Sequence, residues 1–356
     1  MKELALQQNR KQVAYWLLLG VGMIIIQVVL GGITRLTESG LSITEWKPIT
    51  GTLPPMNEAA WMAEFDKYRN TDQFKYVHQH FSLSDFKFIF FWEWFHRVWA
   101  RLLGVVFLIG FVYFIARKKF DKSMVKPMAV LFVLGALQGL VGWIMVKSGL
   151  VPEKYYVGHV ELTTHLIAAI VLLVYTAWFA FNLLPSMQQK IFSPALKNKL
   201  TLLSILLFFQ LVYGGFMAGL KAASVAPTWP SINGKYFPEY MFAEGSLANN
   251  LLNNTIMIHF VHRGLAYLLL LLVIFYSINA FKVKGNKLFN SLNKLLLSLF
   301  LLQVLLGILT VINSTDKQKM VWLGVSHQLV AMLIVLTITG LFVFLKKQIQ
   351  GGQIDK

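Results

Sequence analysis

The sequence contains no cysteine and few charged residues. Of its 356 residues none is Cys, and only 14% are Asp, Glu, Lys or Arg. The absence of cysteine excludes disulfides, thiolate metal sites and thiol chemistry. The scarcity of charge, together with 56% hydrophobic residues and a mean hydropathy of +0.59, is typical of a membrane protein and excludes an ordinary soluble domain.

Eight stretches are long and apolar enough to cross a bilayer as helices, which takes about 20 residues each. No small-residue cleavage pattern follows the first stretch, so we expect it to remain as an uncleaved anchor. The predicted fold class is an all-α integral membrane protein with eight transmembrane helices. The stretches cover residues 13–33, 88–116, 127–147, 157–183, 199–220, 254–281, 289–312 and 322–345.

The net charge of +17 follows the membrane topology and does not indicate nucleic-acid binding. The segments before the first span and after the second, fourth, sixth and eighth spans hold 18 of the 33 Lys and Arg residues, whereas the short segments after the third, fifth and seventh hold six. The positive-inside rule therefore predicts that both termini are cytoplasmic. The basic segments would contact anionic membrane lipid.

The second half of the chain repeats the first. Because the fourth span is even-numbered, the second half enters the membrane with the orientation of the first, so the repeat is parallel. We expect two pseudo-symmetric four-helix bundles, residues 1–185 and 186–356. The matching pairs, at offsets falling from 183 to 162, are Gln27 and Gln210, Gly31 and Gly214, Gly32 and Gly215, Trp46 and Trp229, Gly51 and Gly234, His96 and His262, Gln138 and Gln303, Gly142 and Gly307, and His165 and His327.

Each half carries two histidines at similar depths in even-numbered spans: His96 with His165, and His262 with His327. Paired histidines are what a haem iron needs as axial ligands. Intramembrane histidines otherwise hydrogen-bond between helices, which is the alternative. No cysteine or second carboxylate stands near either pair, so a zinc or di-iron site is disfavoured. We expect His78, in the long outer loop, to be solvated.

The two halves differ one helical turn before the first histidine of each pair. Glu93 precedes His96, and His259 occupies the same place before His262. A carboxylate at the outer edge of the membrane can accept a proton or position a water molecule. The alternative is that Glu93 caps its span or pairs with a nearby arginine.

Several basic residues lie near the outer interface, where haem propionates would emerge. Arginine suits bidentate binding of carboxylates. The same residues could instead anchor the helices at the lipid headgroups. The candidates are Arg35, Lys47, Arg97, Lys221 and Arg263.

Further segments accompany these motifs along nearly the whole chain: Gly31 to Thr37, Gly40-Leu41-Ser42, Trp46-Lys47-Pro48, Gly51, Pro54-Pro55, Glu93 to Arg97, Gln138 to Gly142, His165-Leu166, Thr228-Trp229-Pro230, His262-Arg263 and His327-Gln328. Together they resemble the haem A synthases, which convert haem O to haem A for cytochrome oxidase. Without cysteine, the chain resembles the branch that also occurs in mitochondria.

The resemblance implies that His262 and His327 hold a haem b cofactor in residues 186–356, with His259 beside them. Substrate haem O would be handled at Glu93, His96 and His165 in residues 1–185. It further implies a haem O synthase and an electron donor or acceptor as partners, and it leaves a homo-oligomer open. Without a transit peptide, we expect the cytoplasmic (inner) membrane of an oxygen-respiring bacterium.

Two other functions fit the histidine pattern: a di-haem b-type electron-transfer cytochrome, and a haem carrier or exporter. The difference between Glu93 and His259 favours two unlike sites and hence an enzyme. If His96 and His165 both ligate the substrate iron, oxygen cannot bind there unless one ligand leaves. Either a ligand dissociates, or water supplies the inserted oxygen.

Overall fold

Eight long helices dominate the computed structural model, which describes residues 2–45 and 50–346. All eight are long and apolar enough to cross a membrane, as predicted. Their ends lie close to the predicted ones, except that α1 begins already at Lys2. The helices are α1 (Lys2–Leu36), α3 (Leu83–Ala116), α4 (Lys122–Gly149), α5 (His159–Leu183), α6 (Pro194–Gly219), α9 (Thr255–Ala280), α10 (Lys287–Ile312) and α11 (Lys317–Phe344).

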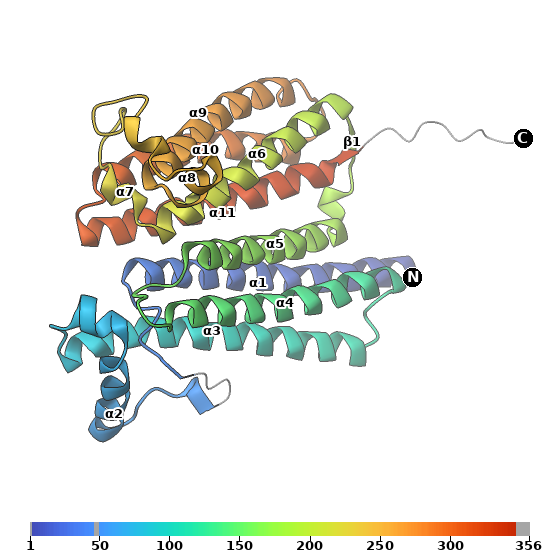
Figure 1. Ribbon diagram of the computed structural model, residues 1–356. Helices are drawn as coiled ribbons and strands as arrows, with labels where there is room; N and C mark the ends of the chain where they lie inside the picture. Colours follow the sequence, from blue (N-terminus) through green and yellow to red (C-terminus); the bar gives the residue numbers. More distant parts are fainter. Residues whose placement is uncertain (1, 46–49, 347–356) are drawn as a thin grey trace, which may run out of the picture.

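Short elements gather at the two ends of the long helices (Figure 1). We call the end built from residues 37–82 and 220–254 the loop end, and the end where α1 begins and α11 stops the terminal end. The terminal end holds η3 (Pro185–Met187) and the parallel pair β1 (Ile191–Phe192) and β2 (Leu345–Lys346). The loop end holds η1 (Thr50–Thr52), α2 (Glu58–Arg69), η2 (Phe74–His78), α7 (Ala222–Val225), η4 (Glu239–Phe242) and α8 (Leu247–Asn253).

Polar residues fix where the spanning helices begin. Ser82 and Asp85 form a capping box at the start of α3, with the Asp85 carboxylate accepting from the Ser82 backbone N–H at 2.9 Å. Asn254 accepts from the backbone N–H groups of Ile256 and Met257 at the start of α9. The first N–H groups of a helix have no partner within it. Side-chain caps satisfy them at the starts of α3 and α9.

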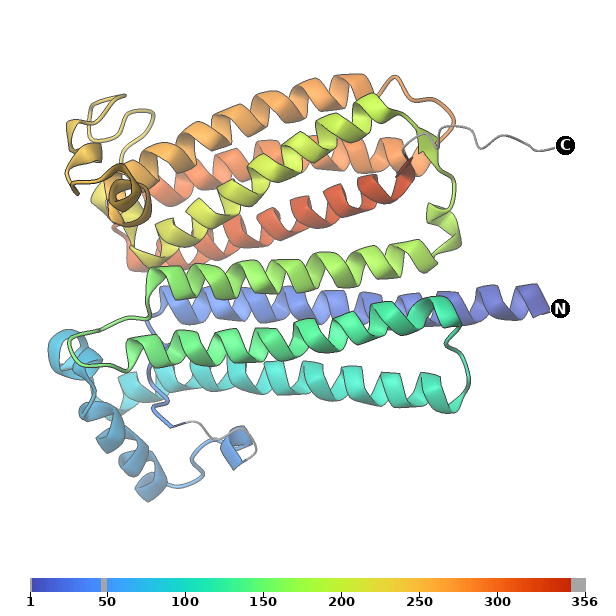
Figure 2. The same ribbon diagram turned by 45° about the vertical axis from the view of Figure 1, so that its right-hand side comes forward.

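The long helices form two adjoining groups (Figures 1 and 2). In the first group, α1 packs against α3 and α5, and α4 packs against α5; in the second, α6 packs against α9, and α10 packs against α9 and α11. The groups meet where α5 and α11 contact each other and where α1 contacts α11 and α5 contacts α6. These contacts agree with two four-helix bundles; the pseudo-symmetric relation between them stays a prediction.

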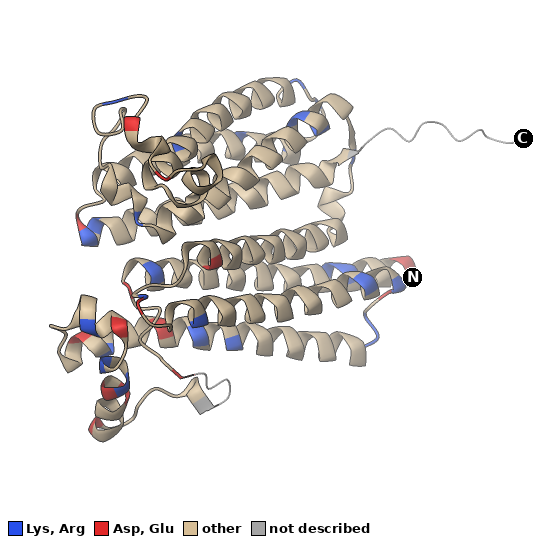
Figure 3. Ribbon diagram, viewed as in Figure 1, with Lys and Arg blue, Asp and Glu red and all other residues tan. Residues whose placement is uncertain are grey.

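The surfaces of the spanning helices are apolar. Most of the ribbon between the two ends carries no charge, and charged residues cluster towards the ends (Figure 3). Helix α11 is the most buried of the eight, whereas α3 and α4 leave most of their surface outside the protein core. Exposed apolar side chains of this kind suit contact with lipid tails. The chain is thus built as a multi-pass membrane protein.

Candidate functional site

A cavity of about 1050 Å³ lies between the spanning helices, and all four predicted ligand histidines line it: His96, His165, His262 and His327. Its volume lies at the upper end of the roughly 300–1,000 Å³ of single-ligand pockets. The structure thus places all four histidines on the wall of one cavity.

The four histidines all lie in the half of their helices that is nearer the loop end. Each lies in the first half of α3, α5, α9 or α11, and all four of these helices begin at the loop end. In residues 2–45 and 50–346 no group of three or more His, Asp or Glu side chains could hold a metal ion. A haem iron takes two axial ligands from the protein, and each histidine pair offers that number.

Glycines leave open space beside the histidines. Gly135 and Gly139 of α4 line the cavity, and a Cβ atom at either would meet no atom within 4 Å. One turn on, a Cβ at Gly142 would lie 2.7 Å from Cε1 of His165. A flat ring can therefore lie against this part of α4, while Gly142 makes room for the imidazole itself.

Glu93 is buried and holds the loop that follows α1. Its carboxylate accepts from the hydroxyl of Ser42 at 2.7 Å, from the backbone N–H of Ile43 at 2.8 Å and from the guanidinium of Arg97 at 2.5 Å. The alternative considered for Glu93, an ion pair with a neighbouring arginine, is therefore present. Glu93 also lines the cavity, so its contacts do not remove it from the candidate site.

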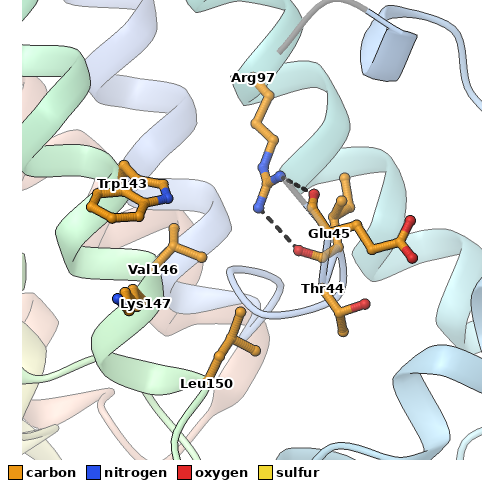
Figure 4. Close-up of a pocket in the computed structure, with 8 residues that line it drawn as sticks. Thr44, Glu45, Arg97, Trp143, Val146, Lys147 and Leu150 are labelled. Carbon is orange, nitrogen blue, oxygen red and sulfur yellow. Dashed lines mark hydrogen bonds between the residues drawn. The ribbon is translucent and has the colours of Figure 1, made fainter. Parts of the chain in front are cut away.

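Arg97 forms one wall of a second, smaller cavity of about 170 Å³ (Figure 4). Its guanidinium donates to the backbone carbonyls of Ile43 at 3.1 Å and Glu45 at 3.4 Å. Trp143 and Lys147 of α4 lie on the opposite wall. Arg97 therefore joins the loop at residues 43–45 to the helix that carries His96.

Arg263 does the same in the second half. It donates to the carbonyls of Ala226 at 3.4 Å and Thr228 at 2.6 Å. At the offset of 183 these residues correspond to Ile43 and Glu45, so both arginines bind matching loop positions. The Nε of Arg263 is buried without a hydrogen-bond partner among the described residues, and Arg263 lines the large cavity.

Arg35 and Lys221 lie where the two halves meet. Arg35 donates to the carbonyls of Ala218 at 2.8 Å and Gly219 at 3.0 Å, at the end of α6. Its Nε has no partner among the described residues, and Arg35 lines the cavity. Lys221 forms an ion pair with Glu38 and is not among the lining residues. The predicted propionate ligand Lys47 lies outside the described residues.

The expectation that His78 is solvated is wrong. Only 4% of His78 is exposed, because its Nε2 donates to Glu38 at 3.2 Å and its Nδ1 lies 2.7 Å from the hydroxyl oxygen of Tyr68. Tyr156 also donates to Glu38, at 3.2 Å. Glu38 is distant in the chain from both His78 and Tyr156, so no local pattern could reveal these contacts.

His259 is fully buried in α9 but does not line the cavity. Neither ring nitrogen has a hydrogen-bond partner among the described residues. Its counterpart Glu93 is held by Ser42, whose own equivalent at the offset of 183 is Val225, which has no side-chain donor. The Glu93–Ser42 contact of the first half is therefore absent from the second.

The fold and this cavity define a multi-pass membrane protein with two pairs of inward-facing histidines. Residues 14–339 match the family described as cytochrome oxidase assembly protein (COX15-CtaA). The haem A synthase of Flavobacterium psychrophilum is 40% identical over 340 residues, covering 93% of this chain and 97% of that protein. The chain therefore belongs to the haem A synthase family.

Relatives elsewhere show the same similarity. The haem A synthase of Rhodospirillum centenum is 40% identical over 337 residues, covering 94% of this chain and 87% of that protein. The haem A synthase COX15 of Saccharomyces cerevisiae is 40% identical over 341 residues, covering 86% of this chain and 70% of that protein. Membership of the family thus rests on nearly the full length of the chain.

Proposed function

We propose that this chain is a haem A synthase that oxidises the methyl group of haem O to the formyl group of haem A through a hydroxymethyl stage. The conversion adds one oxygen and removes four electrons, and with water as the oxygen source it also releases four protons. The observation that carries the proposal is the single cavity lined by two histidine pairs in a chain of this family.

The donor set fits haem. His262 and His327 are neutral nitrogen ligands on opposite helices, and the Nδ1 atom of each is buried without a partner among the described residues. We assign them to a resident haem b, which supplies one-electron redox chemistry when bound. We assign His96 and His165 to the substrate haem O, beside the open surface of Gly135 and Gly139.

The surrounding residues have separate roles in this proposal. Glu93, the catalytic residue, accepts a proton released from the reacting methyl group, and Arg97 keeps its carboxylate in place. The unpartnered Nε atoms of Arg35 and Arg263 suit propionate binding. Lys221 forms an ion pair with Glu38, three residues after Arg35, at the interface between the two halves, which we call the seam. His259 acts only on the surroundings of His262.

The remaining partners follow from the reaction. A haem O synthase must supply the substrate, and an electron donor or acceptor must exchange electrons with the protein, as an acceptor where water supplies the oxygen. We place the protein in a bacterial cytoplasmic membrane with both termini in the cytoplasm, because the basic residues favour that orientation.

Haem analysis of cells tests the function. Cells that express a haem O synthase with this chain should contain haem A, whereas cells with the synthase alone should contain haem O. If the purified protein carries two identical haems and haem A never appears, the chain is an electron-transfer cytochrome. If haem O moves between membranes without modification, it is a carrier.

A further inference from the structure

One spacing recurs on four helices of the site: a glutamine followed four residues later by a glycine. Residues four apart lie on the same face of a helix. In each pair this face lies against one of the four histidines. The pairs are Gln27 with Gly31 on α1, Gln138 with Gly142 on α4, Gln210 with Gly214 on α6, and Gln303 with Gly307 on α10.

The glycine of each pair lies against its imidazole. A Cβ at Gly31 would lie 3.3 Å from Nε2 of His96, and one at Gly214 would lie 3.4 Å from Cε1 of His262. At Gly307 the Cβ would lie 3.0 Å from Cε1 of His327. With the contact at Gly142, all four glycines therefore leave the space into which a histidine ring fits.

The glutamine of each pair lies beside the same ring in the three cases with a measured contact. Gln138 Nε2 lies 3.3 Å from Nδ1 of His165. Gln210 Nε2 lies 3.4 Å from Nε2 of His262, and Gln303 Nε2 lies 3.2 Å from Nε2 of His327. All four glutamines line the large cavity.

The oxygen of each side-chain amide has no hydrogen-bond donor among the described residues. The carbonyl oxygens of Gln27, Gln138, Gln210 and Gln303 are all buried without a hydrogen-bond partner among the described residues. A buried amide oxygen without a donor is costly, so such atoms are rare. The same defect at four equivalent places indicates a donor that each glutamine meets in the working protein.

A ligating histidine supplies that donor. A neutral imidazole that gives one nitrogen to iron carries a proton on the other nitrogen, and that N–H normally meets an acceptor which fixes the ring. At Gln210 and Gln303 a half-turn of the amide exchanges its nitrogen and oxygen and brings the carbonyl to the ring nitrogen. At Gln138 the same exchange gives up the bond from Nε2 to the backbone carbonyl of His165, which is 3.3 Å long.

We propose that the four glutamines are positioning residues: each accepts the N–H of its histidine while the other ring nitrogen faces haem iron. The inference rests on the proposed haem ligation. An amide is a weaker acceptor than a carboxylate, so the histidines stay neutral ligands with little imidazolate character. The midpoint potential of the haem is thereby kept above the value that a carboxylate partner would give.

Substitutions at Gln303 test this in the purified full-length protein, read by reductive titration and by low-temperature electron paramagnetic resonance. Q303E should lower the midpoint potential of the haem, because a carboxylate strengthens the imidazole as a donor. Q303L should raise the potential and weaken haem binding by about 10- to 100-fold. If Q303L retains no haem, the direction in which Q303E shifts the midpoint potential decides whether Gln303 accepts from His327.

Gln328 offers a matched control for charge, since it follows His327 and lines the same cavity but donates to the backbone carbonyl of Val28 at 3.3 Å. Q328E should lower the potential less than Q303E, because its carboxylate is not placed to accept from His327. An unchanged or raised potential in Q303E, or an equal fall in Q328E, overturns the role of Gln303. Wild-type protein that binds no haem would instead overturn the proposed function, so the two failures are distinguishable.

Discussion

Glu93 and His259 occupy matching positions in α3 and α9. The two side chains differ, and so do the residues around them. Glu93 accepts three hydrogen bonds and lines the cavity, whereas His259 is buried without a hydrogen-bond partner among the described residues. The replacement of Ser42 by Val225 at the matching position removes the side-chain donor in the second half. A carboxylate that faces a reaction cavity can move a proton, and a histidine outside the cavity cannot reach the substrate.

Glu93→Gln tests that difference. The amide keeps the size of the side chain and can still accept from Ser42, but it cannot take a proton. We expect conversion of haem O to fall by about 10²- to 10⁴-fold, the usual contribution of a general base. Chromatography of extracted haems should show haem O or the hydroxymethyl form accumulating. Undiminished formation of haem A would mean that Glu93 serves only to hold the loop at residues 42–45.

The ligand residues of the second half are tested by spectroscopy. If the proposed ligation holds, His262→Leu and His327→Leu should each remove a bis-histidine b-type spectrum from the purified protein, because each side chain would supply one axial bond. His259→Leu should leave the spectrum largely intact, since His259 does not line the cavity. Loss of haem in His259→Leu with retention in His262→Leu would move the ligand by one helical turn.

At the scale of helices, α4 carries both an open and a crowded glycine, which allows a matched pair of variants. A Cβ at Gly142 would lie 2.7 Å from His165, so the ring or the helix must shift, and overpacking of this kind typically costs about 1–3 kcal/mol. We expect Gly142→Ala to reduce haem A formation strongly and to lower the thermal stability of the detergent-purified protein. Gly139→Ala is the control for thermal stability alone, because its Cβ would meet no protein atom within 4 Å although Gly139 lines the cavity assigned to haem O. Equal thermal stability of the two variants would contradict the seating role of Gly142.

The orientation of the helices is tested with reporter fusions. Reporters joined after Lys119 or Lys284, which lie at the terminal end, should be active in the cytoplasm. Reporters joined after Asn70 or Lys235, at the loop end, should be active on the outer side. The reason is the excess of basic residues in the segments of the terminal end. An inverted result at two of these sites would reverse the topology.

The spanning helices could be predicted from the sequence, because hydropathy over about 20 residues reports a property of the bilayer and needs no tertiary contact. The loop end could not, since α2 (Glu58–Arg69) is too polar to register as a span. The histidine pairs followed from the repeat. The glutamines and glycines beside the histidines could be recognised in the sequence only as matching positions of the repeat. Their contacts with the histidines depend on how α1 packs against α3 and α10 against α11, which the sequence does not show.

The burial of His78 shows a second limit. A histidine in a long polar loop is usually solvated, and the group that buries this one, Glu38, precedes the whole of α2 in the chain. The cluster around Glu38 depends on how the two halves meet. Contacts of that kind follow from the assembled molecule and leave no signal in the local sequence.

At the scale of the whole molecule, the two halves are joined by residues at matching positions. Glu38 and Lys221 match at the offset of 183, both have positive φ, 59° and 52°, and they form an ion pair. Arg35 likewise donates to Ala218, its own equivalent at the same offset. Residues at matching sequence positions of the two halves therefore contact each other at this interface, and the opposite charges at 38 and 221 stabilise the contact.

The seam therefore predicts a specific response to acid. Hydrogen bonds from His78 and Lys221 hold the pKa of Glu38 well below its usual range, against the opposing effect of burial. Because the folded pKa is lowered, the contribution of Glu38 to stability is complete above its unfolded pKa of about 4.3 and is lost as the pH falls below it. Thermal unfolding of the detergent-purified protein should accordingly show no pH dependence from this group between pH 6 and pH 8, where its contribution is complete, and a fall in melting temperature below about pH 4.

Variants separate Glu38 from the other carboxylates that titrate in acid. Glu38→Gln should lower the melting temperature at pH 7 and flatten its fall between pH 5 and pH 3, because the titrating group is gone. Lys221→Met should raise the folded pKa of Glu38 towards its unfolded value, because only the hydrogen bond from His78 then holds the carboxylate. The melting temperature at pH 7 should be lower, and its fall below about pH 4 should be smaller and end at a higher pH. The double exchange Glu38→Lys with Lys221→Glu should recover part of the loss at pH 7, although His78 then faces a lysine. If Glu38→Gln leaves the acid profile unchanged, the seam is held by the packing of α1, α5, α6 and α11 alone, and the ion pair contributes nothing measurable to the joining of the two halves.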